Sequence, residues 1–181
     1  MSTIPGKSPS VKLPPQVETA RQLLIEHLGK LLTTEETLAR KILPLLTHEV
    51  KDDELLQALD QHLQETRGHV TRVQDAFRAL GEEPQGKPAL GLDALAEERE
   101  SLVRDVVPAL RPGLNCAAAM GTERYEINVY EAAIRLADAL GEEQAGRLLR
   151  QNLEEEVAAL EKLGLNADRL SELEVHEPVI S

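Results

Sequence analysis

The chain has 181 residues, a length typical of one domain, and its 32 acidic against 20 basic side chains give a formal net charge of −12. This charge disfavours nucleic acid and anionic membrane surfaces as partners, because their phosphate groups would be repelled. Aromatic residues make up only 2% of the chain, whereas Leu, Ala, Glu and Arg are abundant. The composition therefore predicts an all-α fold and excludes an ordinary β-sandwich or barrel.

Features of export and of membrane insertion are missing from the sequence. Cys116 is the single cysteine, so an internal disulfide cannot form and a reducing compartment is expected. The first 15 residues have no apolar segment of signal-peptide length. No run approaches the roughly 20 apolar residues of a membrane span. We expect a cytoplasmic protein that binds neither nucleic acid nor membranes.

The first half of the chain predicts a disordered arm followed by two long helices. Residues 1–15 contain four prolines together with Ser and Gly, a composition typical of disorder. Apolar residues then recur at helical spacing over about 16–47, where Pro44 is expected to kink or fray the last turn. A second helix is predicted from about residue 52 to 80, ending at Gly81.

The second half predicts a short helix, two more long helices and a tail. The short helix covers about 92–107 and is broken by the Arg111-Pro112-Gly113 segment. Long helices follow over about 114–140 and 142–163, and we expect Gly141 and Gly164 to end them. Residues 166–181 are expected to form a loose tail, so that the folded domain spans residues 16–165.

The connections between the predicted helices favour one topology. Tight turns join the first two long helices and the last two, which makes each pair antiparallel. A long middle segment, residues 81–113, joins the pairs and carries the short helix. This is the connectivity of a ferritin-like up-down four-helix bundle with a long crossover.

Acidic residues fall on the apolar faces of three predicted helices. Since a helix turns about 100° per residue, Glu35 lies in the middle of the apolar arc of the first helix, and Glu126 lies near the centre of the arc of the helix at 114–140. Glu123 lies one turn before Glu126. On the last helix Glu156 falls inside the apolar stripe, whereas Glu155 points away from it.

The second helix adds imidazoles to this set. His62 and His69 fall on one side of its apolar stripe, and Glu65 lies beside them at the flank. His62 and Glu65 are three residues apart and Glu65 and His69 are four apart, so both pairs share one helix face.

These acidic and imidazole side chains all lie near the middle of their helices, which places them at one level of an up-and-down bundle. Burying several unpaired carboxylates costs several kcal/mol each. Two divalent cations would balance four carboxylates, and carboxylate and imidazole ligands suit Fe or Mn. We therefore expect two divalent metal ions, Fe or Mn, in the bundle core.

Simpler interpretations of the same residues stay open. Each glutamate alone could be a solvated flank or a buried carboxylate paired with an arginine, and each histidine could serve in helix packing. Glu123 could support a ligand or lie at an interface. Tyr130, one turn from Glu126, could donate a hydrogen bond to a ligand or simply fill the core.

Four stretches of the chain resemble the YciF-like bacterial stress proteins, a branch of the ferritin-like superfamily. They cover about residues 20–165 and are TEETLARKI, HLQETRGHV, ERYEINVYEAAIRLADALG and LEEEVAALEKL. The resemblance implies a ferritin-like bundle that forms a homodimer and carries a di-metal site. It implies a metal-ligand set drawn from Glu35, His62, Glu65, Glu123, Glu126 and Glu156, and His69 could add a ligand.

The sequence departs from the family pattern at three positions. Gln64 stands where Glu is frequent, and His69 where relatives can carry Gln. Leu160 stands where relatives tend to have an acidic residue one turn after Glu156, a loss that would empty one coordination position. The Glu-x-x-His spacing of many di-iron proteins is also absent.

Two functions are compatible with these observations. The first is a stress-response protein that uses a di-iron or iron–manganese site to handle O₂ or peroxide, in which Glu35 and Glu126 are terminal or bridging ligands and Glu65 and Glu156 bridge the metals. The second is a non-catalytic helical scaffold or interaction protein with a degenerate metal site, motivated by Leu160. Ile127 and Ile134, on the far side of the helix at 114–140, suggest a partner helix beyond the basic bundle.

Overall fold

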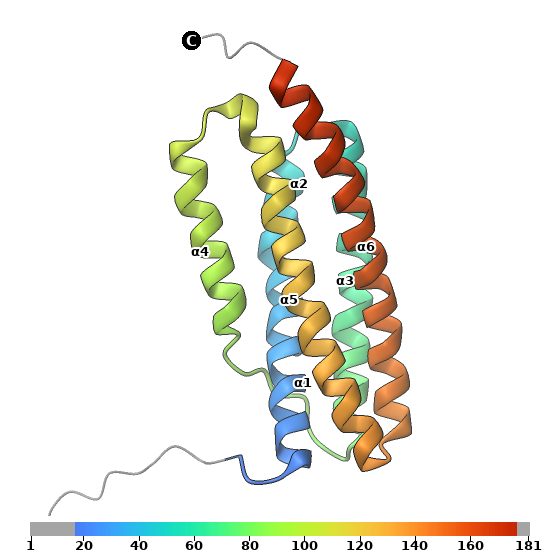
Figure 1. Ribbon diagram of the computed structural model, residues 1–181. Coiled ribbons are helices and arrows are strands. Elements are labelled where there is room, and N and C mark those ends of the chain that lie inside the picture. The colour runs from blue at the N-terminus through green and yellow to red at the C-terminus, as the bar shows by residue number, and fades with distance from the viewer. Residues whose placement is uncertain (1–16, 177–181) are drawn as a thin grey trace, which may run out of the picture.

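Four long helices lie side by side as a bundle in the computed structural model, which describes residues 17–176 (Figure 1). No strand occurs among these residues, so the prediction of an all-α bundle is confirmed. The arm predicted for residues 1–15 lies outside the described residues. The long helices are α1 (Ala20–Thr37), α3 (Asp53–Ala79), α5 (Arg111–Leu140) and α6 (Glu143–His176).

The long helices in Figure 1 run in the relative directions expected for a ferritin-like bundle. α1 and α3 are antiparallel, as are α5 and α6, whereas α3 and α5 run the same way because a long crossover joins them. The crossover carries α4 (Leu90–Asp105), which lies outside the bundle along α5. Two helix ends carry a glycine in the left-handed region: Gly81, where α3 ends and the crossover begins, has φ 72°, and Gly141, in the tight turn between α5 and α6, has φ 73°, as expected where a helix ends.

The crossover passes over α1 at a point where only glycine fits. The backbone N–H of Lys87 donates to the carbonyl oxygen of Gly29 at 2.9 Å. A Cβ atom at Gly29 would lie 2.9 Å from the carbonyl oxygen of Gln85. The absence of a side chain at Gly29 therefore lets the crossover pack directly on the bundle.

The first helix is distorted one turn earlier than the sequence indicates. A π-helix, Leu38–Ile42, follows α1, and α2 (Leu43–Glu49) continues the same path. Pro44 cannot donate a backbone hydrogen bond and its ring would clash with the carbonyl of Arg40 in a regular helix. The wider π turn, in which the Leu43 N–H donates to the Leu38 carbonyl oxygen, accommodates it. This turn begins three residues after Glu35, and π turns often lie at functional sites.

Two boundaries in the second half differ from the prediction. The break falls at a 3₁₀ turn, Pro108–Leu110, and Arg111 and Pro112 already belong to α5. Proline is compatible with the first turn of a helix, where its missing N–H would have no partner. The sequence therefore identified the break but placed it a few residues late.

The prediction of a loose tail is wrong for residues 166–176, because α6 continues through Gly164 to His176. Gly164 does not adopt a positive φ, and Leu170 beyond it is buried in the core. Arg169 forms an ion pair with Asp52, which caps the start of α3. Burial and this ion pair hold the extension, while residues 177–181 lie outside the described range.

The side chain of Ile134 packs within this chain and is not left exposed for a partner helix. It is 7% exposed and packs in the core of the single chain, and Ile127 is partly buried. This part of the wide apolar arc of α5 is used within the chain, so it gives no evidence for a dimer.

The core consists of two apolar clusters, one toward each end of the bundle. The first includes Leu28, Phe77 and Leu149, and the second includes Leu43, Leu59 and Leu163. On each long helix the candidate ligands lie in the sequence between residues of the two clusters. A polar layer therefore separates the clusters at mid-height, as the sequence predicts.

Candidate metal centre

Four helices deliver buried acidic and imidazole side chains to this polar layer. α3 presents two histidines seven residues apart, which is two helical turns, and α5 presents two glutamates three residues apart, so each pair shares one face. Every member of the set is at most 5% exposed. The six residues are Glu35 (α1), His62 and His69 (α3), Glu123 and Glu126 (α5) and Glu156 (α6).

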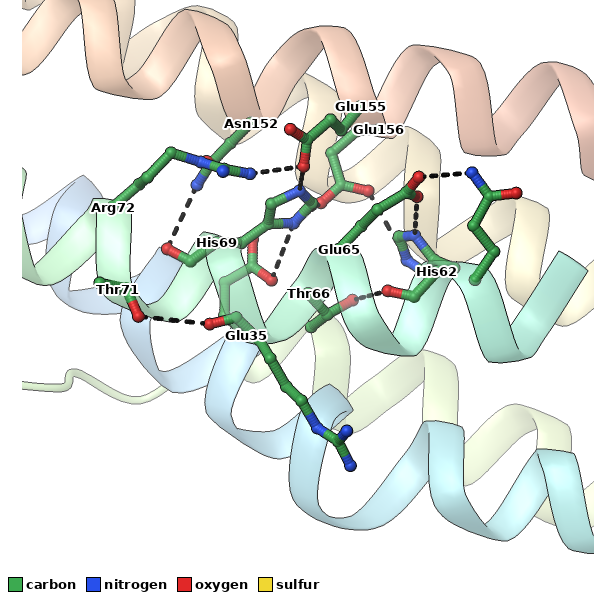
Figure 2. Close-up of polar contacts among 12 residues, drawn as sticks. Glu35, His62, Glu65, Thr66, His69, Thr71, Arg72, Asn152, Glu155 and Glu156 are labelled. Carbon is green, nitrogen blue, oxygen red and sulfur yellow. Dashed lines mark hydrogen bonds and ion pairs between the residues drawn. The ribbon is translucent and has the colours of Figure 1, made fainter.

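The first group of potential ligands consists of Glu35, His69 and Glu156. His69 Nδ1 lies 3.3 Å from Glu35 Oε2 and 2.8 Å from Glu156 Oε1. Figure 2 shows the His69 ring between these carboxylates on one side and Glu155 on the other. One nitrogen and two carboxylate oxygens thus converge on a point inside the bundle.

The second group consists of His62, Glu123 and Glu156. His62 Nε2 lies 3.2 Å from Glu123 Oε1 and 3.7 Å from Glu156 Oε2. The two groups therefore share Glu156, and each of its oxygens faces a different histidine. A carboxylate in this position is arranged as a bridge between two sites.

Glu126 is the least satisfied of the buried carboxylates. It is fully buried, and neither of its oxygens has a hydrogen-bond partner in the described part of the protein. Both oxygens of Glu156, Nδ1 of His69 and Nε2 of His62 also lack a hydrogen bond of good geometry, although these nitrogens lie at ion-pair distance from Glu156. Buried polar atoms are normally paired, so this concentration of unpaired donor atoms fits a ligand set for cations.

Arginine and lysine do not neutralise this layer. Among residues 17–176, no Lys or Arg forms an ion pair with Glu35, Glu123, Glu126 or Glu156. The alternative interpretation of arginine-paired carboxylates is therefore wrong for Glu35, Glu126 and Glu156. Their cationic partners within the protein are the two histidines alone.

The electrostatics of the layer reflect burial and crowding. Burial, together with the neighbouring charges of Glu156 and Glu35, raises the pKa of Glu126 well above its usual range. Burial raises the pKa of Glu156 to about 7. Burial alone would lower the pKa of His69, but Glu156 and Glu35 outweigh it and raise that pKa to about 10. Without bound cations, the layer retains protons that it would lose in water.

Glu65 does not join either group. Its side chain is 23% exposed, and its Oε2 lies 3.8 Å from Nδ1 of His62, on the side of the ring away from Glu123. Gln61 Nε2 donates to its other oxygen at 2.7 Å. The bridging role expected for Glu65 has no support in the two groups, and Glu65 is placed to orient the His62 ring from outside.

Glu155 is a functional neighbour that the sequence analysis missed. Its Oε2 lies 2.9 Å from Nε2 of His69, and Arg72 forms an ion pair with the same oxygen (Figure 2). A carboxylate on the outer nitrogen of a ligating histidine fixes the tautomer of the ring. Glu155 lies off the apolar stripe of α6, so its helical position gave no sign of this contact.

Tyr130, on α5, donates a hydrogen bond to a candidate ligand, which is one of the two interpretations that the sequence left open. Its hydroxyl donates to Glu35 Oε1, and the side-chain amide of Asn152 donates to the Tyr130 oxygen at 2.7 Å. Asn152 also accepts from Nε of Arg72. A continuous hydrogen-bonded chain thus holds Glu35 from the side opposite His69.

A sequence model of the family described as "Domain of unknown function (DUF892)" matches residues 19–176. The chain belongs to this family. Its relatives include protein YciF of Escherichia coli K12, which is 29% identical over 149 residues, covering 81% of this chain and 89% of the relative. The resemblance to YciF-like stress proteins is therefore confirmed.

Solved structures of similar proteins agree in fold with this assignment. The E. coli stress protein YciF has a TM-score of 0.80 at 28% identity, covering 86% of this chain and 99% of the other. YcfI from Rhodopseudomonas palustris has a TM-score of 0.80 at 29% identity, covering 84% and 97%. A Xanthomonas campestris protein has a TM-score of 0.69 at 16% identity, covering 87% and 96%, and shares the fold.

Within the described residues, no helix is long and apolar enough to cross a membrane. This agrees with the expectation that the protein does not span one. The candidate site is a buried cluster of glutamate and histidine side chains that could bind metal.

Proposed function

We propose that this DUF892 protein is a stress-response protein that binds two divalent metal ions, Fe or Mn, in the core of its bundle. The observation that carries the proposal is the pair of three-residue groups that share Glu156. Glu35 and His69 would hold one ion, and His62 and Glu123 would hold the other. Glu156 would contact both ions, and Glu126, whose buried carboxyl interacts with the charges of Glu156, Glu35 and Glu123, would complete the ligand set.

Charge balance supports two ions. The layer contains four buried carboxylates without a Lys or Arg partner in the described residues, and two histidines that are neutral when they ligate. Four negative charges and two divalent cations sum to zero, which removes the cost of burying unpaired charge. A single divalent ion would leave two carboxylates that must stay protonated or uncompensated.

The donor chemistry supports Fe or Mn. Carboxylate oxygens and imidazole nitrogens suit these metals, whereas a thiolate would favour Zn or Cu(I). Cys116 does not contribute a thiolate, because it is buried in the apolar cluster near Leu163 and its thiol donates to the Leu163 carbonyl oxygen. Bound as a pair, Fe or Mn ions would supply redox chemistry toward O₂ or peroxide.

The protein's own residues would orient the ligands. His69 would bind through Nδ1 while its Nε2–H donates to Glu155, and His62 would bind through Nε2 while Nδ1 faces Glu65. Tyr130 holds Glu35 in place by donating to the oxygen that faces away from His69. Each contact fixes a ring or a carboxylate before any metal arrives.

The rival function, a scaffold with a degenerate site, rested on Leu160. This side chain is partly exposed and belongs to neither apolar cluster. Both groups of potential ligands form without an acidic residue at position 160, which favours the metal-binding function over the rival.

Metal stoichiometry tests the proposal. Protein purified from its own host, and metal-free protein dialysed anaerobically against Fe(II) or Mn(II), should each contain two ions per chain by elemental analysis. Glu156→Leu should reduce this to one or none, whereas the exposed neighbour Glu154→Leu should leave it at two. A native protein that takes up no Fe or Mn would refute the proposal.

We also propose a cytoplasmic homodimer. Aliphatic side chains on the C-terminal half of α6 support self-association, since Leu165 is 73% exposed and Leu173 is 49% exposed. Light scattering coupled to size-exclusion chromatography should give twice the chain mass, and Leu165→Glu should shift it toward one chain.

A further inference from the structure

An apolar cavity connects the surface of the protein to the candidate metal centre. It has a volume of about 70 Å³ and lies between the π-helix with α2 on one side and α4 and α5 on the other. Most of its wall is aliphatic. The wall includes Leu38, Ile42, Leu46, Leu92, Leu95 and Ala119.

The residues of the wall range from exposed to deeply buried. Glu100 is exposed, whereas Glu123, also in the wall, is only 2% exposed. Glu123 is one of the six buried ligands, and its Oε2 has no hydrogen-bond partner within the described range. A molecule in this cavity would therefore have solvent at one end and a metal ligand at the other.

The charges near the opening do not favour an ionic ligand. Arg99 donates to the side-chain oxygen of Asn115 at 2.8 Å and forms an ion pair with Glu49. Its positive charge is thus already balanced, and the nearby charge of Glu100 is negative. An anion would meet no unbalanced cation here, and a cation would have to leave water for an aliphatic wall.

The size and polarity of the cavity define the ligand further. About 10–15 Å³ of such volume holds one water molecule, so 70 Å³ corresponds to about five or six non-hydrogen atoms. The hydroxyl of Thr122 is already bonded to the Ala118 carbonyl oxygen. Water would find few partners, whereas an aliphatic chain would bury its surface favourably.

We propose that this cavity binds a small uncharged molecule with a short aliphatic chain, held with one end beside Glu123. Binding depends on the cavity alone, while the position beside two metal ions rests on the function proposed above. The cavity would then hold an organic substrate next to the metal pair.

Other hollows in the structure do not compete for this role. A space of about 10 Å³ beside His62 and Glu65 is no larger than one water molecule. A hollow of about 230 Å³ between α4 and α5, which includes Leu102 and Gly121, contains none of the six buried ligands. The same holds for a hollow of about 270 Å³ lined by α3 and α6.

Matched variants on α4 test the binding step. We would titrate 1-pentanol into the protein and follow amide chemical shifts by NMR. Ala96 lines the cavity, whereas Ala94 on the same helix is exposed and does not. Ala96→Leu should fill the cavity and weaken binding at least tenfold, and Ala94→Leu should bind within twofold of the native protein.

A second cavity-filling variant controls for the case in which Ala96→Leu weakens binding by disturbing the fold. Ala118→Leu enters the same cavity from α5 and should also weaken binding, while thermal unfolding of all three variants should stay cooperative. Equal binding of 1-pentanol by native protein and both filling variants, or no binding by the native protein, would overturn the proposal.

A cobalt-loaded protein tests the proximity to the metals. Adding 1-pentanol should change the visible absorption of Co(II) in the native protein and in Ala94→Leu but not in Ala96→Leu. Cobalt binding with an unchanged spectrum, although 1-pentanol binds, would overturn the position beside the metals. Binding of 1-pentanol by a protein that takes up no metal would support the cavity and refute the metal proposal alone.

Discussion

Replacing Glu126 by methionine should stabilise the metal-free protein and abolish much of its response to metal. Glu126 is fully buried and both of its oxygens lack a hydrogen-bond partner in the described structure. Methionine has a similar volume and no charge, so it can occupy the site with little repacking. The substitution therefore separates the cost of a buried carboxyl from its use as a ligand.

The expected magnitude follows from the protonation of Glu126. Burial raises its pKa well above the usual 4.5, so folding disfavours the charged form of a carboxyl that is ionised in the unfolded chain. Burying a polar group without a partner costs about 1–3 kcal/mol and a charged group more, so we expect a cost of about 3 kcal/mol. Removing the group should raise the melting temperature by roughly 6–12 °C for a chain of this size.

Circular dichroism melts and urea titrations at pH 7 measure this effect, with EDTA and with Mn(II). Native protein should be stabilised by Mn(II), because the ion binds only the folded state. Glu126→Met should start from a higher melting temperature in EDTA and gain less than half as much from Mn(II). The exposed Glu154→Met on α6 is the control and should change stability by no more than about 0.5 kcal/mol.

Two results would contradict this reasoning. If Glu126→Met destabilises the metal-free protein, the Glu126 carboxyl makes stabilising interactions there and its burial is not a net cost. If Glu126→Met responds to Mn(II) as strongly as native protein, Glu126 does not contact the metals.

Three further predictions concern the residues around the ligands. Glu155→Ala should weaken Mn(II) binding by about 10–100-fold, because His69 loses the carboxylate on its outer nitrogen; calorimetric titration measures the affinity, and unchanged binding would count against that role. Tyr130→Phe should destabilise the metal-free protein by about 1–3 kcal/mol, since Glu35 loses a buried donor; urea unfolding measures the loss, and a change near zero would contradict it. In metal-free protein the pKa of Glu156 is about 7 and that of His69 about 10, both above their usual values. The stability that these two groups contribute is therefore full at about pH 4.5 and falls as the pH rises through 7 toward 10. Stabilisation by Mn(II) grows over the same pH range, because the ligands must lose their protons to bind the metal. Urea titrations from pH 5 to pH 9 should show the two trends diverging, and parallel trends would refute the assignment.

The sequence by itself determined the helices and the inward carboxylates. A period of 3.6 residues is a local property, so the apolar stripes identified the long helices and showed that Glu35, Glu126 and Glu156 interrupt them. Mid-helix positions lie at one height in any up-and-down bundle, which is why the polar layer could be expected before its neighbours were known. The left-handed glycines after α3 and α5 were equally local signals.

Only the tertiary structure decided which flanking residues serve the site. Glu65 lies at the flank of the apolar stripe of α3 and Glu155 points away from the stripe of α6, and a helical projection cannot tell which nitrogen of a histidine each will face. That depends on the packing of α6 against α3, which turns His69 toward Glu155 and leaves Glu65 outside His62. The continuation of α6 past Gly164 was also decided by long-range contacts, because glycine permits a helix to end but burial of Leu170 favours continuing it.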